Sequence, residues 1–144
     1  MTAAAGTGEP LPFSHKRHAG LKIECAYCHA SAATGSRAGF PAALKCMLCH
    51  REVAKDSATV RRLAALAVDT PVVPEKPLHE LPDFVIFSHA RHKTGKISCD
   101  TCHGNVWAQD SVKLELNIKM KACIDCHKKY QATTNCTSCH ELNQ

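Results

Sequence analysis

The 144-residue sequence is poor in aromatic residues, with four Phe, two Tyr and one Trp. Large aromatic side chains dominate the buried area of many small cores. A chain of this length with so few of them would form only a marginal hydrophobic core by itself. We therefore expect another group to fill the interior.

Long hydrophobic runs are also missing. The longest apolar stretch, residues 63–73, is interrupted by Asp69, Thr70 and Pro71 and is far too short to span a bilayer. Residues 1–10 lack the charged start and the apolar centre of a secretion signal. The sequence therefore predicts no membrane span within this chain.

Cysteine, by contrast, is abundant, and all ten cysteines fall in five Cys-x-x-Cys-His motifs. In such a motif two thiols form thioether bonds with porphyrin vinyl groups, and the His that follows ligates the iron. Five motifs that use every cysteine predict five covalently attached c-type haems. The predicted attachment residues are Cys25, Cys28, Cys46, Cys49, Cys99, Cys102, Cys123, Cys126, Cys136 and Cys139, with the proximal ligands His29, His50, His103, His127 and His140.

Two other uses of Cys-x-x-Cys are less consistent with the pattern. A four-cysteine zinc site needs two pairs, and five pairs leave one unmatched. A redox dithiol does not require a His after every second Cys. The motif count therefore favours haem over both.

Five further histidines remain, which equals the number of predicted haems: His15, His18, His79, His89 and His92. Because low-spin haem iron takes two axial ligands, the count predicts five bis-histidine haems. His79 stands apart from the other four, which recur in a repeat. Met47 and Met120 are competing ligands, but Met47 lies within a haem-attachment turn and Met120 is expected to pack.

The sequence Phe-Ser-His-x-x-His, followed by six residues and a haem motif, occurs twice, beginning at Phe13 and at Phe87. Prolines at positions 71, 74, 77 and 82 favour an extended connector between the two copies. We therefore divide the chain into a two-haem module (residues 1–69), a Pro-rich connector that carries a distal His (residues 70–86) and a three-haem module (residues 87–144).

The expected fold is mainly irregular with short α-helices and little β structure, packed around five haems. Each His-x-x-His pair fits one helical turn and can reach two different haems. A short helix is predicted from Asp56 or Ser57 through Leu66. Residues 112–120 alternate apolar and polar side chains, which favours an extended segment that lies on a haem.

The repeated motif resembles the class III cytochromes c, a family of small low-potential multihaem proteins. In that family the first His of the pair ligates the haem attached next, and the second His reaches a different haem. The resemblance thus implies a class III-like fold and the axial pairs His15–His29, His18–His50, His89–His103 and His92–His127. That leaves His79 for the haem at His140.

A narrower resemblance extends from Pro12 to His127. Pro12–Gly20, both motifs of the first half and Leu81–His89 are similar to the pentahaem subunit of alternative complex III and to related haem subunits of periplasmic quinone reductase complexes. This implies a periplasmic protein that passes electrons between a membrane quinol-oxidising module and a further redox partner. A soluble shuttle would carry the same motifs. Because c-type haem is normally attached outside the cytoplasm, we expect a signal or anchoring segment to be missing from this version of the chain.

The expected function is outer-sphere electron transfer through five low-potential haems, and not enzymatic catalysis. A multihaem reductase with one open haem and a filament-forming cytochrome are the alternatives. The formal charge of +5 offsets the roughly one negative charge that each haem adds through its propionates. We therefore expect redox protein partners and no nucleic acid.

Overall fold

The computed structural model describes residues 11–66, 79–112 and 116–141, and it is built of short helices joined by irregular chain. The helices are α1 (His15–His18), η1 (Ala19–Leu21), α2 (Cys25–Cys28), η2 (Ala30–Ala33), α3 (Ala43–His50), α4 (Ala58–Ala64), α5 (His89–Thr94), α6 (Asp100–His103), η3 (Val106–Ala108), α7 (Met120–Lys129) and α8 (Cys136–Cys139). Within these described ranges there is no strand, and Val85 and His140 form an isolated antiparallel bridge. The prediction of short helices with little β structure is confirmed.

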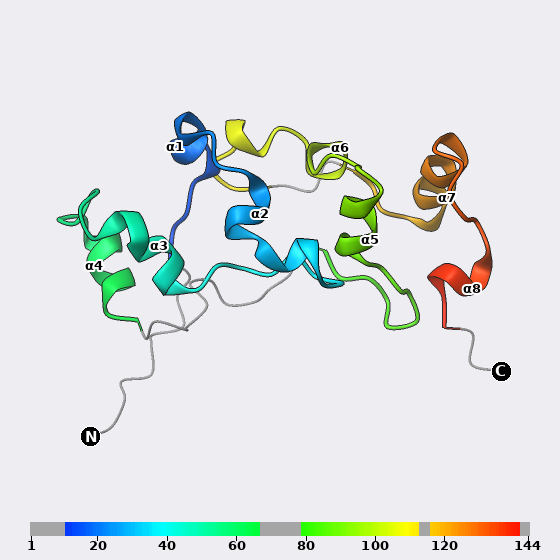
Figure 1. The fold of residues 1–144 in the computed structure, drawn as a ribbon, viewed down its shortest axis with the longest axis horizontal. Helices are drawn as coiled ribbons and strands as arrows, with labels where there is room; N and C mark the ends of the chain where they lie inside the picture. Colours follow the sequence, from blue (N-terminus) through cyan, green and yellow to red (C-terminus); the bar gives the residue numbers. More distant parts are fainter. Residues whose placement is uncertain (1–10, 67–78, 113–115, 142–144) are drawn as a thin grey trace, which may run out of the picture.

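The molecule is elongated, with the helices spread along one axis (Figure 1). From one end to the other, the helices that carry haem motifs follow the order α3, α2, α6, α7 and α8. The first two are exchanged relative to their order in the sequence. The last three keep it.

Apolar packing within the described chain is confined to a small cluster between α3 and α4, where Ala43, Val60 and Leu63 are buried. The helix predicted near residues 56–66 is confirmed as α4, with Ser57 at its N-cap in an extended conformation. Many large apolar side chains, such as Phe13 and Leu48, are exposed. The polypeptide thus buries little of its apolar surface against itself, as the low aromatic content predicts.

The two copies of the repeat contact each other at two places. Helix α1 of the first copy packs on η3 of the second, where the Lys16 amide donates to the carbonyl oxygen of Gln109 (3.1 Å) and the Ser14 hydroxyl donates to Asp110 (2.7 Å). Helix α5 of the second copy packs in turn on η2 and the loop after it. There the amide of His89 donates to the carbonyl oxygen of Ser36 at 3.2 Å. This exchange of contacts joins the two halves at the middle of the molecule.

Two sequence predictions concern the links between helices. The proline-rich connector lies largely outside the described residues, since positions 67–78 are not among them. Of the predicted extended segment 112–120, residues 113–115 are likewise outside. The prediction is wrong at its end, because Met120 is the first residue of α7 and Lys119 is its extended N-cap.

Candidate haem-binding sites

Each Cys-x-x-Cys pair lies on a helical turn: on α2, α3, α7 and α8, and on α6 with Cys99 as its N-cap. Residues three apart on a helix share one face, so the two thiols of each motif point the same way. All ten thiols are free of disulfide bonds. Each motif therefore offers two thiols to one edge of a ligand. We number the sites from first to fifth in the order of their motifs along the chain.

The Phe-Ser-His-x-x-His sequence folds as a rigid unit in both copies. Its Ser caps the helix, since the hydroxyl oxygens of Ser14 and Ser88 accept from the amides of Arg17 and Arg91. The carbonyl oxygen of the same Ser accepts from Nδ1 of the second His, at 2.8 Å in both copies. The Ser of each copy thus orients the second His, a role that the sequence motif alone does not reveal.

The Phe of each copy contacts both histidines of its unit. The Phe13 ring stacks on His18 with centroids 4.7 Å apart and meets His15 edge-on at 4.9 Å. The Phe87 ring stacks on His92 at 4.7 Å and meets His89 edge-on at 4.9 Å. The repeated Phe therefore fixes the orientation of both imidazoles.

Four pairs of imidazole rings have similar centroid separations, although their interplanar angles range from 7° to 71°. The centroid separations are 6.2 Å for His15–His29, 6.1 Å for His18–His50, 6.5 Å for His89–His103 and 6.0 Å for His92–His127. With metal–nitrogen bonds of about 2 Å on each side and a ring radius of roughly 1.1 Å, two imidazoles on opposite faces of one metal ion have centroids roughly 6.2 Å apart. The spacing of these four pairs fits one iron between each pair, and the partners are those that the class III resemblance implies.

Hydrogen bonds fix the tautomer of most of these rings. A backbone carbonyl oxygen lies 2.5–2.9 Å from Nδ1 of His18, His29, His50, His89, His92 and His127. The acceptors are Ser14, Gly39, Val53, Ser36, Ser88 and Thr133 in the same order. Because a carbonyl can only accept, Nδ1 carries the proton and Nε2 keeps its lone pair. This is the tautomer that a metal-ligating His requires when it bonds through Nε2.

The fifth site differs from the other four. The His140 ring lies 5.8 Å from the Phe84 ring, and its Nδ1 is buried without a hydrogen-bond partner. His79, its predicted partner, is exposed, and no ring contact joins these two described residues. The structure therefore brings together four of the five predicted pairs and leaves His79 apart from His140.

Burial has opposite effects on the pKa values of imidazoles and thiols. It lowers the pKa of His15 and of His103, and neighbouring imidazoles lower both further. It also raises the pKa of several thiols, namely Cys25, Cys28, Cys46, Cys102 and Cys123. Neutral imidazoles suit metal ligation. The raised pKa values keep these five thiols protonated, unlike the reactive thiols of redox dithiols.

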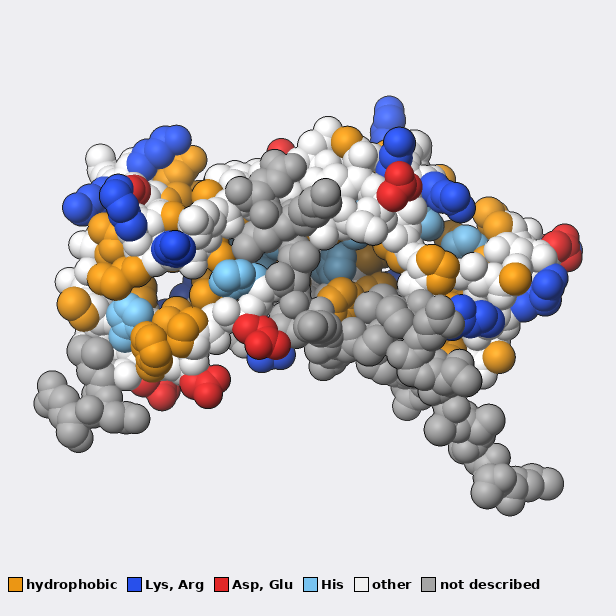
Figure 2. Space-filling model, turned by 180° about the vertical axis from the view of Figure 1, so that it is seen from behind, with side chains coloured by type: hydrophobic (Ala, Val, Ile, Leu, Met, Phe, Trp, Pro, Cys, Tyr) orange, Lys and Arg blue, Asp and Glu red, His pale blue; other side chains and the backbone are white. Residues whose placement is uncertain are grey.

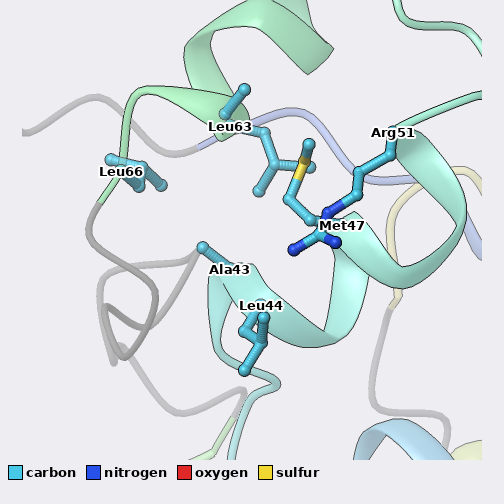
Figure 3. Close-up of a pocket in the computed structure, with 7 residues that line it drawn as sticks. Ala43, Leu44, Met47, Arg51, Leu63 and Leu66 are labelled. Atoms are coloured by element: carbon cyan, nitrogen blue, oxygen red, sulfur yellow. The ribbon is translucent and has the colours of Figure 1, made fainter.

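Met47 and Met120 were the competing ligands in the sequence. Met47 projects from α3 toward Leu63 of α4 and lines a hollow of about 190 Å³ with Leu44, Arg51 and Leu66 among others (Figure 3). Met120 is 65% exposed. These placements agree with packing for Met47 and give Met120 no described role as a ligand.

Residues 85–141 match the family model described as cytochrome c7 and related cytochrome c. The match covers the last three haem motifs and His89 and His92. This family consists of electron-transfer proteins with several haems, and not of enzymes. The second half of the chain is thus similar to multihaem cytochromes c, which attach their haems covalently. A search among curated proteins gave no match, and none of the described helices is long and apolar enough to cross a membrane.

Proposed function

We propose that this chain binds five c-type haems and conducts electrons between partner proteins. The observation that carries the proposal is the set of four imidazole pairs with centroids 6.0–6.5 Å apart, each beside a Cys-x-x-Cys turn. The match of residues 85–141 to the cytochrome c7 family supports the same function for the second half. The repeated motif extends it to the first half.

Each motif's two thiols would hold one haem, and each facing pair of histidines would hold its iron. In the fifth site His79 would complete the set opposite His140. When bound, haem supplies a one-electron carrier at its iron, and histidine on both faces favours a low reduction potential. The chain's own part is to fix the imidazoles through the carbonyl hydrogen bonds and to close both faces, so that no substrate reaches the metal.

The row of histidine side chains along the long axis of the molecule supports conduction (Figure 2). Lys and Arg side chains lie at both ends of this face, where a partner protein would approach (Figure 2). Multihaem c-type cytochromes typically lie outside the cytoplasm. We therefore propose a periplasmic carrier or a subunit of a quinol-oxidising or quinone-reducing membrane complex, with a two-haem module at residues 1–69 and a three-haem module at residues 87–144.

One observation favours a second candidate. Phe84, and not a histidine, lies against the ring of His140. If the fifth haem had Phe84 on its distal side, its iron would keep an open coordination position. The protein would then resemble a multihaem reductase in which four haems feed one reactive site.

Mass spectrometry of the intact protein, combined with electron paramagnetic resonance of the oxidised form, tests the proposal. We expect the mass of the polypeptide plus five haems and a purely low-spin spectrum. Four haems in the mass would refute the pentahaem assignment. A high-spin signal equal to one haem in five would instead favour the reductase.

A further inference from the structure

The predicted haem sites lie in single file. The motif helices follow the order α3, α2, α6, α7 and α8 along the long axis (Figure 1). The thiols of successive sites are close enough to interact electrostatically, in the pairs Cys46–Cys28, Cys25–Cys99, Cys102–Cys126 and Cys123–Cys139. The order in space is therefore second, first, third, fourth and fifth, and the second and fifth sites form the two ends.

The two ends differ in how their imidazoles are held. In the second site both Nδ1 atoms donate to backbone carbonyls, from His18 to Ser14 at 2.8 Å and from His50 to Val53 at 2.9 Å. In the fifth site the Nδ1 of His140 is buried and has no partner. The two end sites, where electrons would enter and leave, thus differ most in the hydrogen bonding of their imidazoles.

The three sites between the ends differ in the number of Nδ1 hydrogen bonds to backbone carbonyls. The fourth site has two such hydrogen bonds, from His92 and His127. The first and third sites have one described bond each, from His29 and His89. The second and fourth sites therefore have the most hydrogen bonds to their imidazoles, and the first and third sites have fewer. The fifth site has none at His140.

The sign of the effect follows from charge. A proton shared with a carbonyl gives the imidazole partial anionic character and makes its other nitrogen a stronger donor. A stronger donor stabilises ferric iron more than ferrous iron, which lowers the reduction potential. An imidazole whose Nδ1–H has no acceptor donates more weakly, so its iron is easier to reduce.

Surface charge does not offset this difference. Basic side chains lie near both ends, with Arg61 and Arg62 on α4 and Lys128 and Lys129 on α7. These side chains are exposed in both places, so salt screens their electrostatic effect. The hydrogen bonds are made by the ligands themselves, so we base the order of the sites on them.

We propose that the fifth haem has the highest reduction potential and the second haem one of the two lowest, so that electrons run from the second site to the fifth. A one-electron donor protein docks at α3 and an acceptor protein at α8. With haems bound, each transfer would oxidise one ferrous iron and reduce its ferric neighbour, and no bond would form or break. This inference rests on the proposed five-haem assignment.

The test compares two double variants of the full, haem-loaded protein in a spectroelectrochemical titration. Cys136→Ala/Cys139→Ala removes the fifth haem, and we expect the titration to lose its highest-potential step. Cys46→Ala/Cys49→Ala is the matched control at the other end and should lose a step from the low-potential part. At one applied potential, the ratio of reduced to oxidised haem should differ between these two sites by at least about tenfold. For a one-electron couple this corresponds to a difference of about 59 mV in reduction potential. Loss of a low-potential step from the first variant would overturn the proposal.

A second measurement needs no variant. During stepwise reduction of the natural protein, nuclear magnetic resonance follows the shifted haem methyl signals. Those with contacts to the Phe84 ring should lose their ferric shift first, and those with contacts to His18 and His50 among the last. The reverse sequence would overturn the direction of flow while leaving the five-haem assignment intact, whereas a missing haem in the mass spectrum would refute the assignment itself.

Discussion

The rings of His89 and His103 lie 6.5 Å apart and only 7° from parallel, although they come from different helices, α5 and α6. His89 is held from one side by the carbonyl oxygen of Ser36 in the other half of the chain, at 2.7 Å from its Nδ1. The orientation of a predicted ligand in the second half thus depends on a loop of the first half.

Replacing His79 by Ala tests the weakest of the five predicted pairs. We expect the variant to contain one five-coordinate, high-spin haem, because the iron at His140 would lose its second ligand. Electron paramagnetic resonance and the binding of carbon monoxide to the reduced protein measure this. Glu80→Ala, at the neighbouring exposed residue, is the control and should remain low-spin. An unchanged spectrum in His79→Ala would show that His79 is not a ligand.

Replacing His92 by Met tests whether the fourth haem is ligated as proposed. A thioether ligand raises the reduction potential relative to imidazole, so one step of the titration should move upward while the haem stays low-spin. A titration followed by visible absorption measures the shift. Lys93→Met introduces the same side chain at an exposed position of α5 and should leave every step in place. Equal titrations for both variants would contradict the assignment of His92.

Replacing Ser88 by Ala removes the side-chain cap of α5. The hydroxyl accepts from the Arg91 amide at 3.3 Å, and loss of such a cap costs about 1 kcal/mol in the free energy of unfolding. Thermal or denaturant unfolding of the haem-loaded protein measures the cost. Ser57→Ala is the control, since Ser57 precedes α4 without a side-chain capping bond. A similar loss in both variants would show that the cap itself is not responsible.

Replacing Gly39 by Ala should disturb the first site. Gly39 has a φ of 69°, and an added Cβ would lie 3.2 Å from the Ser31 hydroxyl oxygen. The strain costs about 1 kcal/mol or more and displaces the carbonyl that accepts from His29 Nδ1 at 2.7 Å. We expect lower stability and a higher potential for the first haem, measured by unfolding and by titration.

Gly20→Ala is the control for this change. A Cβ at Gly20 meets nothing within 4 Å, and its carbonyl holds no described imidazole. Its stability and all five potentials should therefore match those of the natural protein. If Gly20→Ala shifted a potential as far as Gly39→Ala, the carbonyl of Gly39 would not be the cause.

Much of the architecture could be predicted from the sequence because the motifs are local. Cys-x-x-Cys-His fixes its own helical turn, and Phe-Ser-His-x-x-His fixes another, so short helices at these places follow directly. The contact between α1 and η3 could not be predicted, because it joins residues almost a hundred positions apart through backbone groups that no sequence pattern marks. The same holds for the carbonyl acceptors, since any residue can supply one.

The predicted ligand pairs also differ in whether a local motif supports them. The pairs such as His18–His50 followed from the repeat and its resemblance, and the centroids of these two rings do lie 6.1 Å apart. His79 lies outside the repeat, so only the count of histidines assigned it, and the structure leaves it exposed. A count gives the number of ligands but no position for them.

The exchange of contacts between the two halves has a consequence for biogenesis. During synthesis of the chain, α1 emerges long before Gln109 and Asp110, the residues on which it rests. His15 therefore lacks its final support until the second half has been made. We expect the second half to act as an intramolecular template that locks the first half into place, so that a chain truncated before η3 would accumulate with poorly oriented ligands and be open to proteolysis.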